Sequence, residues 1–149
     1  MNENKKIIFC LGIMHNAIRK IADAKFMEIH HELSGMYVLI LLYLERQEQE
    51  HKKVFQKDLE QEFQISKATV SRILSRMEKK NLVRRKGDVG DARFKWIIMT
   101  EYARKMLPDL KKVEEQLECS ILDGFSQGDK GILLNYIAKM EHNLWKSDK

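Results

Sequence analysis

Apolar residues recur every three or four positions along most of this chain, which is the spacing of one face of a helix. The first such segment runs from Ile7 to Ile21, and Met36–Leu44 is an uninterrupted apolar run. That run predicts a second helix, buried on all sides, from Met36 to about Glu48, with Ser34 as its N-cap. Further helices are expected at Lys57–Phe63, Ser66–Lys80, Thr100–Asp123 and from Ser126 onward.

The pattern changes after Asn81, which is expected to end a helix because asparagine tolerates a left-handed backbone. Leu82–Lys86 and Arg93–Met99 are rich in β-branched and aromatic residues. Between them lies a segment of glycine and aspartate, residues 87–91, which is typical of a turn. The sequence therefore predicts a β-hairpin in a mostly helical protein. Thr100 is expected to cap the long helix that follows, and Pro108 to kink that helix.

Composition adds few constraints. The chain has 149 residues, 44% of them apolar and 33% charged, which fits a single globular domain over residues 1–149. Its longest apolar run is far shorter than the roughly 20 residues of a membrane span, and no signal peptide is expected at its start. The two cysteines are too few for a disulfide scaffold. We therefore expect a cytoplasmic protein with no membrane association.

Positive charge is concentrated in one window. Residues 64–95 hold ten lysines or arginines against three acidic residues, a local net charge of +7, whereas the rest of the chain carries −2. Such a concentration is typical of a surface that binds a polyanion. A solvated basic helix face would have the same charge, so charge alone leaves both interpretations open.

Two short helices, a tight turn and a β-hairpin together form a winged helix-turn-helix, predicted here for residues 34–99. The helix that begins after Ser66 has a buried stripe of Val70, Ile73, Leu74 and Met77, opposite a polar face. A helix fits the major groove of B-DNA, where arginine and lysine donate hydrogen bonds to guanine. The basic and hydroxyl residues predicted to contact DNA are Ser66, Lys67, Thr69, Ser71, Arg72, Arg76, Arg84, Arg85 and Lys86.

The sequence resembles the MarR-type winged helix-turn-helix regulators over nearly its whole length. The resemblance rests on Gln56–Leu59, Ile65–Arg72, Met77–Arg85, and Asp91-Ala92-Arg93, which matches the Asp-x-Arg motif of that family's wing. It implies that Arg93 enters the minor groove and that Asp91 steadies it through an ion pair. Asn81, Met99 and Tyr102 depart from the family pattern, and the resemblance would place Tyr102 beside an effector cleft.

The resemblance also implies a homodimer joined by its N- and C-terminal helices, in residues 1–30 and 100–149. Two apolar stripes, read independently, exceed what a small domain needs for its own core, although such stripes are equally typical of an intramolecular core. They consist of Ile7, Leu11, Met14 and Ile18 near the N-terminus, and Leu133, Ile137, Met140 and Leu144 near the C-terminus. A dimer would read a pseudo-palindromic operator, with two heads about 34 Å apart.

We therefore expect a homodimeric, double-stranded-DNA-binding transcriptional regulator, acting as a repressor that a small molecule or an oxidant releases. Candidate effector-pocket residues are Met14, Met36, Tyr37 and Tyr43, and Cys10 is the candidate redox site. A buried cysteine in an apolar stripe is more often inert packing. The alternative function is a winged-helix module that docks on another protein as an anti-regulator.

No enzyme activity, cofactor or metal is expected. The chain has neither a nucleophile elbow nor a phosphate-binding glycine loop followed by a helix. Its five histidines lack the spacing of a zinc site, and none lies between Thr100 and Asp123.

Overall fold

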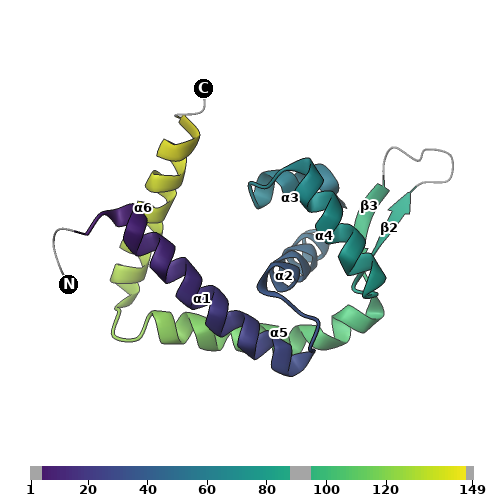
Figure 1. Ribbon diagram of the computed structural model, residues 1–149, viewed down its shortest axis with the longest axis horizontal. Coiled ribbons are helices and arrows are strands. Elements are labelled where there is room, and N and C mark those ends of the chain that lie inside the picture. Colours follow the sequence, from purple (N-terminus) through teal and green to yellow (C-terminus); the bar gives the residue numbers. More distant parts are fainter. Residues whose placement is uncertain (1–4, 88–94, 147–149) are drawn as a thin grey trace. The chain divides into compact units, whose positions relative to one another are not determined.

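The computed structural model describes residues 5–87 and 95–146. They form two compact units, one ending at Val113 and the other beginning at Glu114, and each unit is described by itself. Figure 1 shows the order of the elements along the chain. They are α1 (Ile7–Ile29), α2 (Gly35–Gln49), β1 (Val54–Phe55), α3 (Gln56–Glu62), α4 (Lys67–Lys79), β2 (Val83–Gly87), β3 (Lys95–Met99), α5 (Glu101–Ile121) and α6 (Gln127–Lys146).

The mostly helical fold with a small β-wing is confirmed, and each predicted helix is present. The first helix is longer than its apolar stripe, since α1 continues to Ile29. The sequence analysis missed one strand, β1, which pairs with β3 and completes an antiparallel sheet of order β1-β3-β2. Two residues are too few for a pattern of alternation to be visible, so the sequence alone does not identify Val54–Phe55 as a strand.

The core of the N-terminal unit is formed where α2, α4 and the start of α5 meet the inner face of the sheet. Its fully buried side chains include Ile40, Leu41, Leu44, Leu59, Val70, Leu74, Met77, Leu82, Val83 and Leu110. The predicted stripe of α4 is thus confirmed at Val70, Leu74 and Met77, whereas Ile73 is only half-buried. The expectation that α2 is buried on all sides is wrong at Leu39, which is 49% exposed.

The ends of α2 and α4 are set by caps of different kinds. Ser66 accepts a hydrogen bond from the Thr69 amide at 3.2 Å, so it is the predicted N-cap of α4. Asn81 has a φ of 55°, which confirms the expected left-handed stop. Ser34 occupies the N-cap position of α2, but its side chain makes no capping bond. The Gly35 amide donates to Asp23 Oδ1 at 2.6 Å instead, so an acidic side chain of α1 caps α2.

The C-terminal unit contains the end of α5, a turn and α6. Ser126 Oγ accepts from the Asp129 amide at 3.1 Å, and Asp129 Oδ2 accepts from the Ser126 amide at 2.8 Å. These reciprocal bonds start α6 as predicted, and the hydrogen bonds from Ser126 lower the pKa of Asp129. No residue of α6 is buried in this unit as described.

Candidate nucleic-acid interface

The helix-turn-helix is held together by polar contacts at the start of α3. Asp58 Oδ2 accepts a hydrogen bond from the Phe55 amide at 2.7 Å, which caps α3. Gln56 Nε2 donates to the Lys67 carbonyl oxygen at 3.3 Å, which joins the start of α3 to the start of α4. Gln64 takes a φ of 51° in the turn between the two helices. The orientation of α4 is therefore set by backbone contacts as well as by its buried stripe.

The polar face of α4 is open to solvent. Lys67, Arg72 and Arg76 are exposed, and neither arginine pairs with a carboxylate in the part of the chain that the structure describes. Ser66 and Thr69 are engaged with each other, since their hydroxyl oxygens lie 2.9 Å apart. Ser71 is half-buried. Three free cations on one exposed face, opposite a packed one, are suited to contact a polyanion.

The wing places its cations on two different faces. Arg84 and Lys86 are exposed, whereas Arg85 between them is half-buried. Arg85 Nε lies 3.5 Å from Glu78 Oε2 on α4 and has no hydrogen-bond partner among the described residues. The side chain of Arg85 thus faces α4, and this ion pair links the wing to the recognition helix. Asp91 and Arg93 lie outside the described residues.

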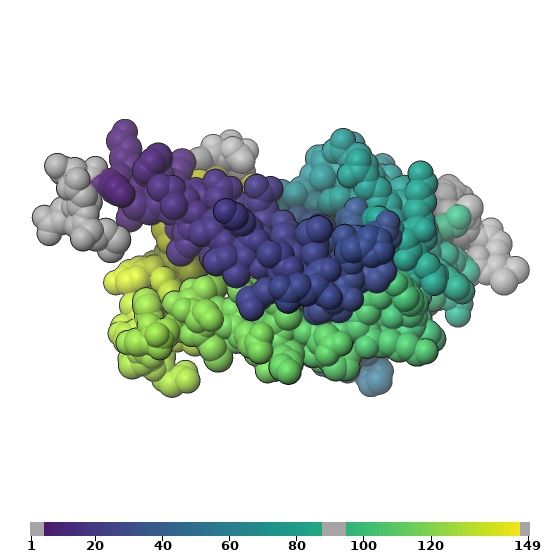
Figure 2. Space-filling model, turned by 60° about the horizontal axis from the view of Figure 1, so that its bottom comes forward, coloured from purple at the N-terminus to yellow at the C-terminus, as the bar shows by residue number. Residues whose placement is uncertain are grey.

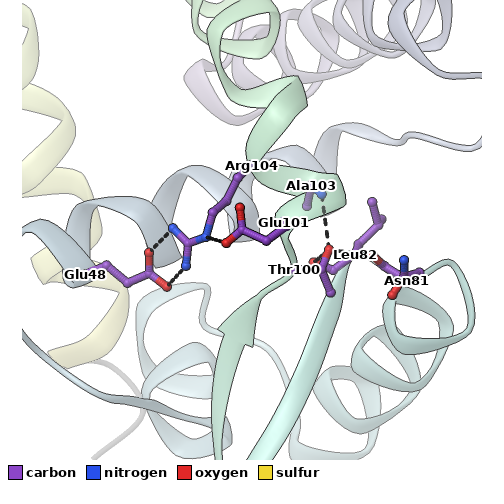
Figure 3. Close-up of polar contacts among 7 residues, drawn as sticks. All are labelled: Glu48, Asn81, Leu82, Thr100, Glu101, Ala103 and Arg104. Atoms are coloured by element: carbon purple, nitrogen blue, oxygen red, sulfur yellow. Dashed lines mark hydrogen bonds and ion pairs between the residues drawn. The ribbon is translucent and has the colours of Figure 1, made fainter.

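Two further polar contacts, made by Lys80 and Thr100, hold the C-terminal end of α4 in place. Lys80 Nζ lies 2.8 Å from Glu32 Oε1 in the segment between α1 and α2, and this hydrogen bond lowers the pKa of the Glu32 carboxyl. Thr100 Oγ1 donates to the Asn81 carbonyl oxygen at 2.6 Å and accepts from the Ala103 amide at 3.1 Å, as Figure 3 shows. One buried hydroxyl therefore both caps α5 and closes the end of α4.

Replacing Thr100 with valine is expected to lower the free energy of unfolding by about 1–3 kcal/mol, because two buried hydrogen bonds are lost without a change in shape. Thr100 is only 7% exposed, so water does not replace the hydroxyl. Urea denaturation would measure the change. Thr100→Ser keeps the hydroxyl and is expected to lose less stability, and a Thr100→Val protein as stable as the unaltered one would contradict this role.

A fork of ion pairs fixes α5 to α2. Both terminal nitrogens of Arg104 donate to Glu48, at 2.7 and 2.8 Å, and Arg104 Nε also lies 3.3 Å from Glu101 (Figure 3). The hydrogen bonds that Arg104 donates to Glu48 raise the pKa of Arg104. Two turns further along α5 and one turn back along α2, Lys111 Nζ donates to Glu45 Oε1 at 2.7 Å. The sequence analysis missed these pairs because their partners are more than 50 residues apart.

The predicted dimerisation residues are largely uncovered within one chain. Figure 2 shows α1, in purple and dark blue, at the surface, and its Ile7 is 64% exposed. On α6, Leu144 is 68% exposed and Ile137 is 43% exposed. Leu11 and Met14 are also exposed, whereas Ile18, Leu133 and Met140 are half-buried. Both stripes thus leave apolar surface that their own unit does not cover.

The candidate effector residues lie on α1 and α2. Tyr43 lies on α2 with its ring 5.8 Å from that of Phe63, and burial raises the pKa of its hydroxyl. Met36 and Tyr37 are half-buried at the start of α2, and Met14 is exposed on α1. Two pockets lie in the C-terminal unit around Gly124 and Phe125, and none of the four candidates lines them.

The cysteines and histidines are the remaining candidates for a reactive or metal-binding role. Cys10 is half-buried and Cys119 is exposed, and both are free thiols. His30 stacks on His31 and meets the ring of Tyr102 edge-on at 6.0 Å, so Tyr102 packs against the end of α1. Within residues 5–87 and 95–146 we find no group of three or more potential metal ligands. No described helix is both long enough and apolar enough to cross a bilayer.

Known proteins resemble this chain in sequence and in fold. The sequence profile of the MarR family matches residues 31–93, which span α2, the helix-turn-helix and β2. The transcription regulator MarR from Oenococcus oeni PSU-1 has 27% sequence identity and a TM-score of 0.78, over 92% of this chain and 99% of that one. The chain is therefore similar to the MarR family of transcription regulators, in sequence over residues 31–93 and in fold over most of its length.

Two further MarR-type structures share the fold. A putative MarR family regulator from Listeria monocytogenes, complexed with a 26mer DNA, has 22% identity and a TM-score of 0.82, covering 96% of this chain and 91% of that one. The S. aureus MepR–DNA complex has 23% identity and a TM-score of 0.83, covering 97% and 99%. These similarities confirm the winged helix-turn-helix architecture, with its order of six helices and three strands.

Proposed function

We propose that this protein binds double-stranded DNA with α4 in the major groove and the wing in the adjacent minor groove. The exposed cationic face of α4, carrying Lys67, Arg72 and Arg76 opposite a fully packed stripe, is the observation that carries the proposal. The relatives from L. monocytogenes and S. aureus, whose structures contain DNA, support it. Arg93 and Asp91 would complete the contact from the wing.

The protein would act as a homodimer held by α1, α6 and the end of α5. The exposed apolar side chains of α1 and α6 support this assembly, because an isolated chain would leave them in water. Two copies would then place two α4 helices on successive major grooves of a pseudo-palindrome. In this proposal the protein represses transcription by occupying a promoter.

Release from DNA would follow a small-molecule or oxidative signal. Met14, Met36, Tyr37 and Tyr43 are the residues we propose for effector contact, and Cys10 for oxidation. For any such signal to act, it must bind or modify the DNA-free form preferentially, because a ligand with equal affinity for both forms shifts nothing.

Selection of bound fragments from genomic DNA, followed by affinity measurements on the recovered site, tests the proposal. Binding is expected to weaken steeply with salt, with a slope of log K against log [salt] of about −0.9 for each phosphate neutralised. Sedimentation of the complex should show an even number of chains on each duplex. A protein that selects no site and ignores duplex DNA at low salt, yet captures a protein partner, would favour the anti-regulator alternative.

A further inference from the structure

The wing sheet has an outer face that extends beyond the predicted DNA contacts Arg84 and Lys86. In the register of the sheet, Trp96 at the centre lies opposite Phe55 on one side and Lys86 on the other. Successive strand residues point to opposite faces, so the neighbouring row of Val54, Ile97 and Arg85 belongs to the core side. Val54 and Ile97 are indeed each 3% exposed.

The outer face has a distinct composition. We call it the Trp96 face, and it consists of Lys53, Phe55, Arg84, Lys86, Trp96 and Ile98. Lys53 Nζ lies 3.9 Å from the centroid of the Trp96 ring, and Lys86 Nζ lies 5.9 Å from it. Arg84 is exposed opposite Ile98, one residue pair further along. A half-exposed indole is thus flanked by Lys53, which immediately precedes β1, and by Lys86 of β2.

No carboxylate balances this charge within the sheet. The residues of β1, β2 and β3 include no aspartate or glutamate, whereas Arg84, Arg85, Lys86 and Lys95 are all cationic. Only Arg85 among these four is paired with an acidic side chain in the described structure, through Glu78 on α4. Basic side chains interleaved with an aromatic ring are suited to a nucleic-acid backbone, since the amines neutralise phosphates while the ring packs on the sugars.

The position of the Trp96 face favours DNA over an acidic protein. Lys86 and Trp96 face each other at the ends of β2 and β3 that adjoin residues 88–94, the segment that carries Arg93. A wing that enters a minor groove brings these strand ends next to the backbone beyond that groove. The Trp96 face is therefore continuous with the DNA interface proposed above.

We propose that the Trp96 face binds the phosphate backbone of duplex DNA that flanks the operator, outside the base pairs read by α4 and the wing. This inference rests on the proposed DNA-binding function and extends its contact area. It predicts that affinity depends on the length of flanking duplex and not on the flanking sequence, because phosphates carry no base information.

The test compares two duplexes, one trimmed to the half-sites and their minor-groove segments, and one extended by about one helical turn of arbitrary sequence at each end. The variant is Lys53→Gln. The matched control is Lys105→Gln, which removes one exposed lysine from α5. Fluorescence anisotropy at several salt concentrations measures the affinity for each duplex.

For the long duplex, the variant should bind more weakly than the unaltered chain, and its salt slope should be smaller by about 1 per Trp96 face engaged, the value expected for one phosphate contact. For the short duplex, the variant and the unaltered chain should agree, and the control should behave as unaltered on both. Equal losses on the two duplexes, or no loss on either, would overturn the inference while leaving the proposed function intact. An unaltered chain that binds neither duplex would overturn both.

The fluorescence of Trp96 gives a second readout that does not depend on the lysine substitutions. The chain has two tryptophans, so Trp145→Phe leaves Trp96 as the single reporter. Its emission should change on addition of the long duplex and stay constant with the short one. A change produced equally by poly-glutamate would assign the Trp96 face to acidic protein partners and would overturn the DNA proposal.

Discussion

Replacing Leu74 with alanine is expected to lower the free energy of unfolding by about 2–5 kcal/mol, the range for a leucine removed from a closed core. Leu74 is fully buried at the centre of α4, where the helix packs on α3 and the sheet. The lost contacts would weaken the packing of α4 on the rest of the N-terminal unit. The measured DNA affinity should therefore fall as well, because a smaller fraction of the protein is folded.

Urea denaturation followed by circular dichroism measures the loss at Leu74. Ser75→Ala is the matched control, because Ser75 is exposed on the same helix and its hydroxyl bonds only to the Ser71 carbonyl oxygen. Its stability is expected to stay within about 0.5 kcal/mol of the unaltered protein. A Leu74→Ala protein that unfolds at the same urea concentration would mean that α4 does not pack as described.

The second large effect is expected at Arg72 on the exposed face of α4. If Arg72 contacts a base edge, Arg72→Ala should reduce the discrimination between the correct and a substituted base pair by about 1–3 kcal/mol. If it contacts phosphate alone, affinity should fall evenly for all sequences and the salt slope should decrease by about 1. Both outcomes follow from a free guanidinium on a helix that faces the duplex.

Competition binding with single-base-pair variants of the selected operator separates the two outcomes. Lys105→Ala, which removes an exposed charge from α5, should leave both affinity and base preference unchanged. Full affinity and full base preference in the Arg72→Ala protein would contradict the orientation proposed for α4.

Local signals in the sequence were sufficient to place most of the fold. Ser66 and Asn81 mark the two ends of α4 through side-chain capping and backbone tolerance, and both act within four residues of the chain. The apolar spacing of Val70, Leu74 and Met77 identified the buried side of α4 for the same reason. These features depend on near neighbours, so a single sequence is enough to identify them.

Features that depend on distant partners were not visible in the sequence. The Arg104–Glu48 fork and the Lys53–Trp96 contact join segments more than 40 residues apart, and nothing in the charge pattern selects those partners among many. Arg85 is a second example. In the sequence it is one of three consecutive wing cations, and only the alternation of side chains along β2 shows that it points toward Glu78. Pairing across the sheet, and not local propensity, divides the wing cations between the two faces.

The absence of any buried residue from α6 in its own described unit has a thermodynamic consequence. Most helical stability in proteins comes from packing of an apolar face, and this helix has few intramolecular contacts of that kind. Under the proposed assembly, the C-terminal segment orders only when a second copy arrives, so folding and association become one equilibrium there. The melting temperature should then rise with protein concentration, and dilution should have the same effect as a mild denaturant.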